Sequence, residues 1–194
     1  VEVLDAYREA GNAPRSVAVF VGGGNNGGDG LVLAKLLIEA GIPCTTYSLA
    51  AASKFQNEAK MALEDFAQAG GRLIAYSPAD DSLSQAGTAP RFAGFTLAVD
   101  CMLGNGAHGE LRELYAAAVR DIAASNIPVV AADAPTGYDS QEHVRREPCI
   151  HALETLLFGF PRLDAYTREG GPAFGEASVA PLGYPAGTVA QFSE

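Results

Sequence analysis

Short apolar runs alternate with amphipathic segments along most of this chain of 194 residues. Five of the runs have the length and composition of buried strands, and they lie at 16–21, 43–49, 72–76, 95–99 and 128–132. Two further runs, at 153–158 and 177–180, are candidates for late strands separated by a stretch rich in Gly and Pro. The pattern therefore predicts strands at regular intervals along the chain.

The segments between these runs carry apolar residues at helical spacing. The first predicted helix spans 31–40 and ends before a glycine. The second is expected to start at Ser53, where a Ser-x-x-Gln capping pattern begins, and to stop before Gly70. The third covers the apolar positions of 111–122, and residues 77–91 are expected to form an exposed linker around a weak helix.

Strands that alternate with helices predict an α/β protein with a mostly parallel sheet covered on both faces. The chain has a mass of 20.1 kDa, and 48% of its residues are hydrophobic. This is enough apolar material for one full core, so a single domain over residues 1–194 is expected.

Charge and composition exclude several classes of partner. The formal net charge of -10 argues against a nucleic-acid surface, because phosphate backbones are held by clustered Lys and Arg. No apolar stretch approaches the ~20 residues that span a bilayer, and the first residues lack the basic and apolar regions of a signal peptide. A soluble, cytoplasmic protein is predicted, with an organellar location after removal of a targeting segment as the alternative. Cys44, Cys101 and Cys149 lack metal-ligand spacing and are expected to be reduced core thiols.

The segment from Val21 to Gly30 carries the most specific chemistry, with glycines, two amides and a carboxylate between a predicted strand and a predicted helix. A strand, a glycine turn and a helix N-terminus together form a phosphate cradle. Unpaired backbone N–H groups and the helix dipole favour an anion, and the missing side chains allow a pyrophosphate to approach.

Two more predicted strands end in unusual loops. The fourth leads into the segment from Asp100 to Glu110, and the fifth into Asp133-Ala-Pro-Thr-Gly137. Because ligands of parallel sheets bind outside the carboxyl ends of the strands, all three loops are expected at one rim.

A nicotinamide dehydrogenase is one alternative, since Gly22, Gly24 and Gly27 satisfy the G-x-G-x-x-G spacing. That fingerprint also needs an Asp or Glu about 20 residues further on, to bind the ribose hydroxyls. The chain has Ser48-Leu-Ala-Ala51 at that place. The missing acid argues against this alternative.

The three loops, in this order, resemble those of the NAD(P)H-hydrate epimerase family, also called the YjeF N-terminal domain family. The resemblance runs from about residue 16 to 137, and it is fainter around Thr155–Arg162 and near Gly183. It implies a Rossmann-like three-layer αβα sandwich, a homodimer, and an isomerase that interconverts the R and S epimers of NADHX and NADPHX in nicotinamide cofactor repair.

The resemblance also implies roles for individual residues. Asp133 would contact the reacting ring and act as catalytic acid/base. Potassium would be the cofactor, held by Asn26, Asp100 and Thr136, which offer the hard oxygen donors that an alkali cation prefers. The substrate-binding residues would be Asn25, Asn26, Gly27, Gly28, Asp29, Gly104, Asn105, Gly106, Ala107, His108, Gly109, Glu110 and Asp133.

Each of these residues also has a purely structural interpretation. Asp100 and Asp133 could cap the turns that follow them, and Asp29 could be a first-turn acid that complements the helix dipole. Tyr115, at helical spacing, is expected in the core. His108 receives no catalytic role.

The chain departs from the family in the later half. Asn105 stands where Thr is common, Thr136 where Ser is usual, and Arg162 where Lys is common, and the segment after Gly137 has a different sequence. These changes favour either a shifted substrate or, as the alternative function, a non-catalytic dimerising or protein-binding module of the same fold. The intact Asn26, Asp100 and Asp133 favour the enzyme.

Overall fold

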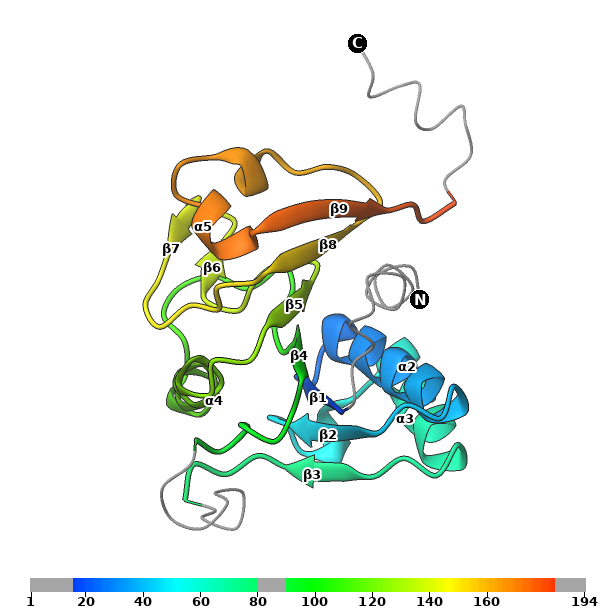
Figure 1. Cartoon of the computed structure of the whole chain (residues 1–194). Coiled ribbons are helices and arrows are strands. Elements are labelled where there is room, and N and C mark those ends of the chain that lie inside the picture. Colours follow the sequence, from blue (N-terminus) through cyan, green and yellow to red (C-terminus); the bar gives the residue numbers. More distant parts are fainter. Residues whose placement is uncertain (1–15, 80–89, 184–194) are drawn as a thin grey trace.

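The computed structural model describes residues 16–79 and 90–183, and this part of the chain is built around one parallel sheet (Figure 1). The sheet has seven strands in the order β3-β2-β1-β4-β5-β8-β9, and every neighbouring pair is parallel. The strands are β1 (Val17–Val21), β2 (Cys44–Ser48), β3 (Leu73–Ala75), β4 (Leu97–Cys101), β5 (Val129–Ala132), β8 (Glu154–Phe158) and β9 (Glu176–Ala180). The expected α/β fold is confirmed.

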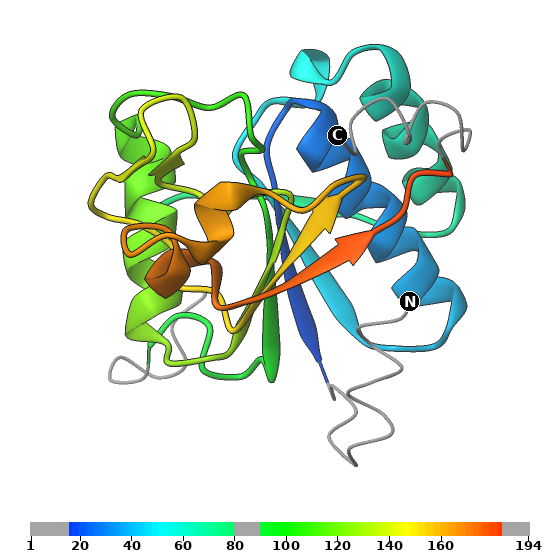
Figure 2. The same ribbon diagram turned by 90° about the horizontal axis from the view of Figure 1, so that it is seen from above.

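Helices cover both faces of this sheet. The longer ones are α2 (Asn25–Glu39), α3 (Asn57–Gln68) and α4 (Glu113–Ala124). Helices α2 and α3 lie on one face and α4 lies on the other (Figure 2). This arrangement is the three-layer αβα sandwich that the sequence predicts. None of the described helices is long and apolar enough to cross a membrane.

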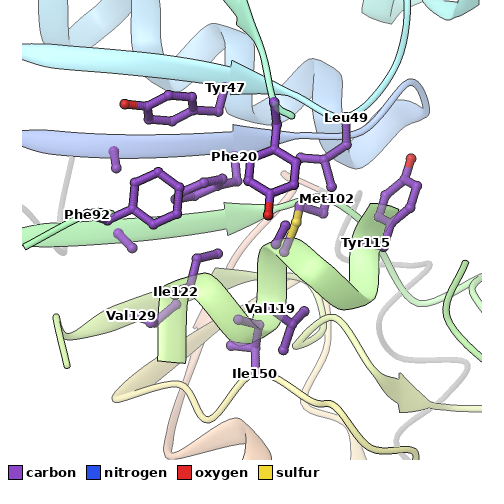
Figure 3. Packing of buried hydrophobic residues seen from close by; sticks show 14 of the residues in the cluster. Phe20, Tyr47, Leu49, Phe92, Met102, Tyr115, Val119, Ile122, Val129 and Ile150 are labelled. Atoms are coloured by element: carbon purple, nitrogen blue, oxygen red, sulfur yellow. The ribbon is translucent and has the colours of Figure 1, made fainter. Parts of the chain in front are cut away.

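Side-chain alternation along β1 explains why both faces are apolar. All five residues of β1 are buried. Val19 and Val21 belong to the cluster with α2 and α3, whereas Phe20 belongs to the cluster with α4 (Figure 3). The Phe20 ring stacks on Tyr47 at 5.2 Å and meets Phe92 edge-on at 4.9 Å. A fully buried side chain of this size contributes about 1.5–3 kcal/mol to stability.

The strand order reverses between β1 and β4. From β1 the chain continues to β2 and β3 on one side, and it then crosses back to β4 and β5 on the other side. At such a switch point the loops after the two central strands leave toward opposite faces, so that a crevice opens at the carboxyl edge of the sheet. The loops after β1, β4 and β5 meet at this edge.

Two helix starts differ from the sequence-based expectation. Helix α2 begins at Asn25 rather than at Leu31, so it includes most of the glycine motif. Glycine has low intrinsic helix propensity, which tertiary packing overrides here. Asp29 is consequently the fifth residue of α2 and is not a first-turn acid. Helix α3 begins at Asn57, with Gln56 as N-cap and no hydrogen bond from a capping side chain. The helix start predicted at Ser53 from the capping pattern is therefore wrong. Ser53 lies instead in a short 3₁₀ turn, η1 (Ala52–Lys54), that precedes α3.

Several short elements after β5 have no counterpart in the hydrophobic pattern. They are β6 (Tyr138–Asp139), β7 (Val144–Arg145), η4 (Leu163–Tyr166) and α5 (Gly171–Phe174), and β6 and β7 form an antiparallel pair. Elements of two to four residues are too short to show a period. Most of the predicted linker at 77–91 lies outside the described residues.

The three cysteines are free thiols, as the sequence predicts. Cys101 and Cys149 are buried in the core and Cys44 is half-buried.

Candidate functional site

The N-terminus of α2 opens directly into a cavity. Gly24 is its N-cap and contributes no side-chain cap, and the first intrahelical donor that reaches back to it is the Gly28 N–H, 3.1 Å from the Gly24 oxygen. The N–H groups ahead of Gly28 therefore lack an intrahelical acceptor. Gly23, Gly24 and Asn25 line the cavity. Free N–H groups and the helix dipole together favour an anion at this point.

The glycines of the motif fall into two groups. A Cβ at Gly27 would lie 1.8 Å from the Gly22 oxygen, and one at Gly22 would lie 2.0 Å from the Met102 oxygen. A Cβ at Gly28 would meet the backbone of Ala59 at 3.0 Å. These glycines allow α2 to approach its neighbours, and Gly27 and Gly28 are not among the residues that line the cavity. A Cβ at Gly24 would meet nothing within 4 Å.

Asp133 stands at the end of β5 in an unusual backbone conformation, with φ of 66°. Left-handed conformations are uncommon for residues other than glycine, although Asp tolerates them better than most. Asn105 donates its backbone N–H to Asp133 Oδ2 at 2.7 Å, which joins the second loop to the third. A Cβ at Gly104 would lie 2.9 Å from the same Oδ2 atom and 3.2 Å from the Asn26 Cβ. Glycine at position 104 thus leaves the space that the Asn26 and Asp133 side chains occupy close to the second loop.

Asp29 lines the same cavity as Asp133. Partial burial raises the pKa of the Asp29 carboxyl, and the negative charge of Asp133 raises it further. Asp29 therefore takes up a proton more readily than an ordinary aspartate. Such a pair can divide acid and base roles between its members.

We expect the substitution Asp133→Asn to lower the pKa of Asp29, because it removes the negative charge that opposes ionisation there. The carboxyl resonance of Asp29, followed by NMR over a pH titration, measures the change. Asp65→Asn, on the exposed side of α3, is the matched control and should leave the Asp29 titration unchanged. An unaltered titration in Asp133→Asn would show that the two groups are not coupled.

The second loop divides between two adjoining cavities. Gly104, Asn105, Gly106 and Ala107 line the main one. Residues 108–110 line a smaller one of about 230 Å³, whose other walls include Arg112 and Tyr138. The structure therefore places His108, Gly109 and Glu110 beside the main cavity rather than in it.

Asp139, in the segment that departs from the family, holds the second loop in place. It is 2% exposed, and its Oδ2 accepts the Gly109 N–H at 2.8 Å and the Arg146 Nε–H at 3.1 Å. The hydrogen bond from Gly109, with further ones from Glu142 and Arg146, lowers the pKa of the Asp139 carboxyl against the opposing effect of burial. The altered sequence after Gly137 thus keeps a structural link to residues 104–110.

Asp100 and Thr136 lie behind the cavity. Asp100 is fully buried, and Thr136 donates its backbone N–H to Oδ2 and its hydroxyl to Oδ1, both at 2.8 Å. Met102 donates its N–H to Oδ1 at 3.1 Å. Burial raises the pKa of the Asp100 carboxyl to about 6, although these hydrogen bonds oppose the shift. Asp100 therefore caps the turn that follows it, which is the structural role that the sequence allowed. It is also a buried carboxylate at the switch point of the sheet.

Asn26 is another buried polar side chain, and it lines the cavity. Its Nδ2 donates to the Ala132 oxygen at 3.1 Å, whereas its buried Oδ1 has no hydrogen-bond partner among the described residues. A buried acceptor without a partner costs about 1–3 kcal/mol, so it marks a place where a donor or a cation fits. Among residues 16–79 and 90–183, no cluster of three or more His, Cys, Asp or Glu side chains is placed to hold a metal. An amide oxygen of this kind suits a monovalent cation better than zinc.

The main cavity has a volume of about 850 Å³, within the range of sites for small molecules and cofactors. Its floor is the end of the α4-side core cluster, where Leu49, Met102 and Tyr115 lie together (Figure 3). Tyr115 is 8% exposed, so it is a core residue as expected, yet it also lines the cavity. An apolar floor beneath a polar rim suits a ligand with a flat ring and charged groups.

Sequence reasoning missed Arg162 as a site residue. Arg162 Nη1 lies 3.8 Å from Asp133 Oδ1, and Nη2 donates to Asp164 Oδ2 at 2.7 Å. The guanidinium also packs over the Phe174 ring at 5.8 Å. The sequence indicated this role only through a basic residue at a position where Lys is common in the family. The contact with Asp133 forms because the chain turns back toward β5 after β8.

Fold and cavity define a doubly wound α/β protein with its candidate site at the carboxyl edge of the sheet, beside a glycine loop of the phosphate-binding type. Residues 1–163 match the family model described as YjeF-related protein N-terminus. The chain belongs to this family.

Similar proteins include enzymes with curated names. The NAD(P)H-hydrate epimerase of Rhodopirellula baltica is 32% identical over 193 residues, which cover 99% of this chain and 74% of that protein. The bifunctional NAD(P)H-hydrate repair enzyme Nnr of Moorella thermoacetica is 32% identical over 190 residues, which cover 98% of this chain and 35% of that protein. The chain thus spans about a third of the bifunctional relative and about three quarters of the epimerase.

A crystal structure of the yeast protein ynu0 has the same fold. It aligns with a TM-score of 0.74 at 21% identity, over 93% of this chain and 72% of the yeast chain.

Proposed function

We propose that this chain is a NAD(P)H-hydrate epimerase, an isomerase that interconverts the R and S epimers of NADHX and NADPHX. One observation carries the proposal. The Asp133 carboxyl, fixed by the Asn105 N–H, lines the same cavity as the uncapped N-terminus of α2. A single ligand can therefore place phosphates at the helix and a reacting ring at the carboxylate. The family and the names of the relatives support the same assignment.

The reaction needs proton transfer at the hydrated ring carbon. The hydroxyl must leave and return on the opposite face, or the ring must open and close. Asp133 acts as the acid/base. Asp29 is the second proton-transfer group, because it lines the same cavity and its raised pKa lets it hold a proton more readily. Asp100 is fully buried and is not among the lining residues, so it does not reach the ring.

The assay that tests this proposal follows the loss of the R epimer from a mixture of NADHX and NADPHX, coupled to an S-specific dehydratase. We expect consumption well above the spontaneous rate. Consumption at the spontaneous rate, together with no binding of NADP-type dinucleotides in a titration, would instead favour the non-catalytic module. Oxidation or reduction of a nicotinamide cofactor by the protein would favour the dehydrogenase.

Potassium is the proposed cofactor. Asn26, Asp100 and Thr136 would hold it, and the orphaned Asn26 Oδ1 and the buried Asp100 carboxylate support this assignment. When bound, the cation would balance the charge of Asp100 and offset phosphate charge close to the glycine loop. The chain's own contribution is to orient these oxygens away from bulk water.

We expect potassium to raise the melting temperature of the protein relative to an equal concentration of choline. A ligand at ten times its Kd stabilises by about 1.4 kcal/mol, which corresponds to roughly 3–5 °C for a protein of this size. Thr136→Val removes the hydroxyl and should abolish the response, whereas Thr136→Ser keeps the hydroxyl and should retain it. Equal melting temperatures of the wild type in the two salts would contradict a potassium site.

A homodimer is the proposed assembly. An apolar groove of about 290 Å³ runs beside α2 on its side of the sheet, and Val32 and Leu36 at its edge are 46% and 40% exposed. A second copy could cover these side chains. We expect Leu36→Glu to convert a dimer into a monomer in light scattering, and Met61→Glu, at an exposed site on α3, to leave the dimer intact. A monomeric wild type would rule out the homodimer.

A further inference from the structure

Two cationic side chains line the main cavity, and neither has an acidic partner among the described residues. They are Lys54 and Arg112. The ion pairs of the described part of the chain involve other Lys and Arg residues. Arg112 packs over the Tyr115 ring at 5.8 Å. In a protein with a formal charge of -10, two cations without an acidic partner at one cavity indicate an anionic ligand.

Lys54 follows strand β2 on the loop that ends in η1. The loop is anchored by the buried Phe55, and the Lys54 N–H donates to the Ala51 oxygen at 2.8 Å. The same loop contacts the glycine motif, because a Cβ at Gly23 would lie 3.1 Å from the Lys54 Cβ. The backbone therefore fixes the Lys54 Cβ next to the glycine motif.

The carboxyl end of β2 has a defined role in dinucleotide-binding sheets. An acid there binds the two ribose hydroxyls of an unphosphorylated dinucleotide, and a basic residue accommodates a 2′-phosphate. In this chain the residues after β2 that line the cavity are Leu49, Ala50, Ala51 and Lys54. Lys54 is the charged one among them, and none of these four described residues is a carboxylate.

We propose that Lys54 binds the 2′-phosphate of the adenosine ribose and gives the site a preference for the 2′-phosphorylated hydrate, NADPHX, over NADHX. The inference rests on the proposed epimerase function. Leu49 belongs to the same loop as Lys54, and with Met102 and Tyr115 it forms the apolar floor that would support the adenine ring. Arg112 is the N-cap of α4 and also lines the smaller cavity. It is therefore less suited than Lys54 to a ribose bound at the carboxyl end of β2.

The first test compares kcat/KM for the R epimers of NADPHX and NADHX in the wild type and in Lys54→Gln. We expect the ratio of the two values to fall about tenfold in Lys54→Gln, since a charged hydrogen bond to phosphate contributes about 1.5 kcal/mol or more. Lys54→Arg should retain the ratio. Lys60→Gln makes the same charge change on the exposed side of α3 and should also retain it.

Other outcomes would overturn the inference. An equal fall for both substrates would place Lys54 at the diphosphate, and no change would place it outside the ligand's reach. A selective loss in Arg112→Gln but not in Lys54→Gln would move the 2′-phosphate to the other wall.

A binding measurement keeps the inference testable without turnover. Calorimetry should show that the wild type binds adenosine 2′,5′-bisphosphate about tenfold more tightly than AMP, and that Lys54→Gln loses this difference. The difference should shrink as salt rises, because the contact lies near solvent. If the wild type fails to epimerise either hydrate, the proposed function fails, and this comparison still decides the role of Lys54. Equal affinities of the wild type for the two nucleotides would refute the inference.

Discussion

Asp133→Asn is expected to lower the rate of epimerisation by a factor of about 10²–10⁴, the contribution typical of a positioned general acid/base. The physical reason is that an amide at this position neither donates nor accepts the proton that must move at the ring carbon. The coupled R-epimer assay with the dehydratase in excess measures the loss.

This substitution should leave the fold intact. Asn tolerates the left-handed conformation of residue 133, with φ of 66°, and its side-chain oxygen can still accept the Asn105 N–H. Asp65→Asn, which removes an exposed carboxylate on α3, is the matched control and should keep the wild-type rate. Full activity in Asp133→Asn would show that Asp133 is not the acid/base. The rate of Asp29→Asn would then show whether Asp29, the other carboxylate that lines the cavity, has that role.

Gly27→Ala is expected to cost about 3 kcal/mol of unfolding free energy, at the upper end of the range for overpacking. The added Cβ would lie 1.8 Å from the Gly22 oxygen, which belongs to the backbone and cannot rotate away. Either α2 moves off the sheet or the glycine turn distorts. Equilibrium unfolding in urea, with the change in midpoint at constant slope, measures the effect.

Gly24→Ala in the same motif provides the contrast. A Cβ at Gly24 meets nothing within 4 Å, and its backbone is extended, so the cost should stay below about 1 kcal/mol, mainly from a poorer N-cap. Similar losses in the two variants would mean that the general properties of glycine, rather than the close contact at Gly27, explain the motif.

The hydrophobic and polar pattern was enough to predict the strands and the class of fold. Four of the first five sheet strands lie inside a predicted apolar run, because a strand buried on both faces must be apolar along its whole length. Strand β4 extends two residues past its predicted run and includes Asp100 and Cys101. The site could also be placed at one rim, since parallel strands bring their carboxyl ends to the same edge. The resemblance then selected Asn26, Gly104 and Asp133, which the structure brings together around the main cavity.

Long-range packing decided the rest. Local propensity places the start of the first helix after the glycines, but the contacts of Gly22 and Gly27 with neighbouring backbone stabilise a helix that begins at Asn25. The same packing moves Gly27 and Gly28 away from the cavity and leaves Gly24 open to it.

The charged residues around the site also depended on the tertiary structure. Arg162 reaches Asp133 from 29 residues further along the chain, and Asp139 binds Gly109 across 30 residues. Lys54 lines the cavity because the loop after β2 folds against the glycine motif. The sequence by itself determined the order of the elements and the chemistry of the loops, because these follow from local periodicity and residue type. The tertiary structure alone decided which charges meet, because segments distant in sequence become neighbours only when the sheet and its covering layers are assembled.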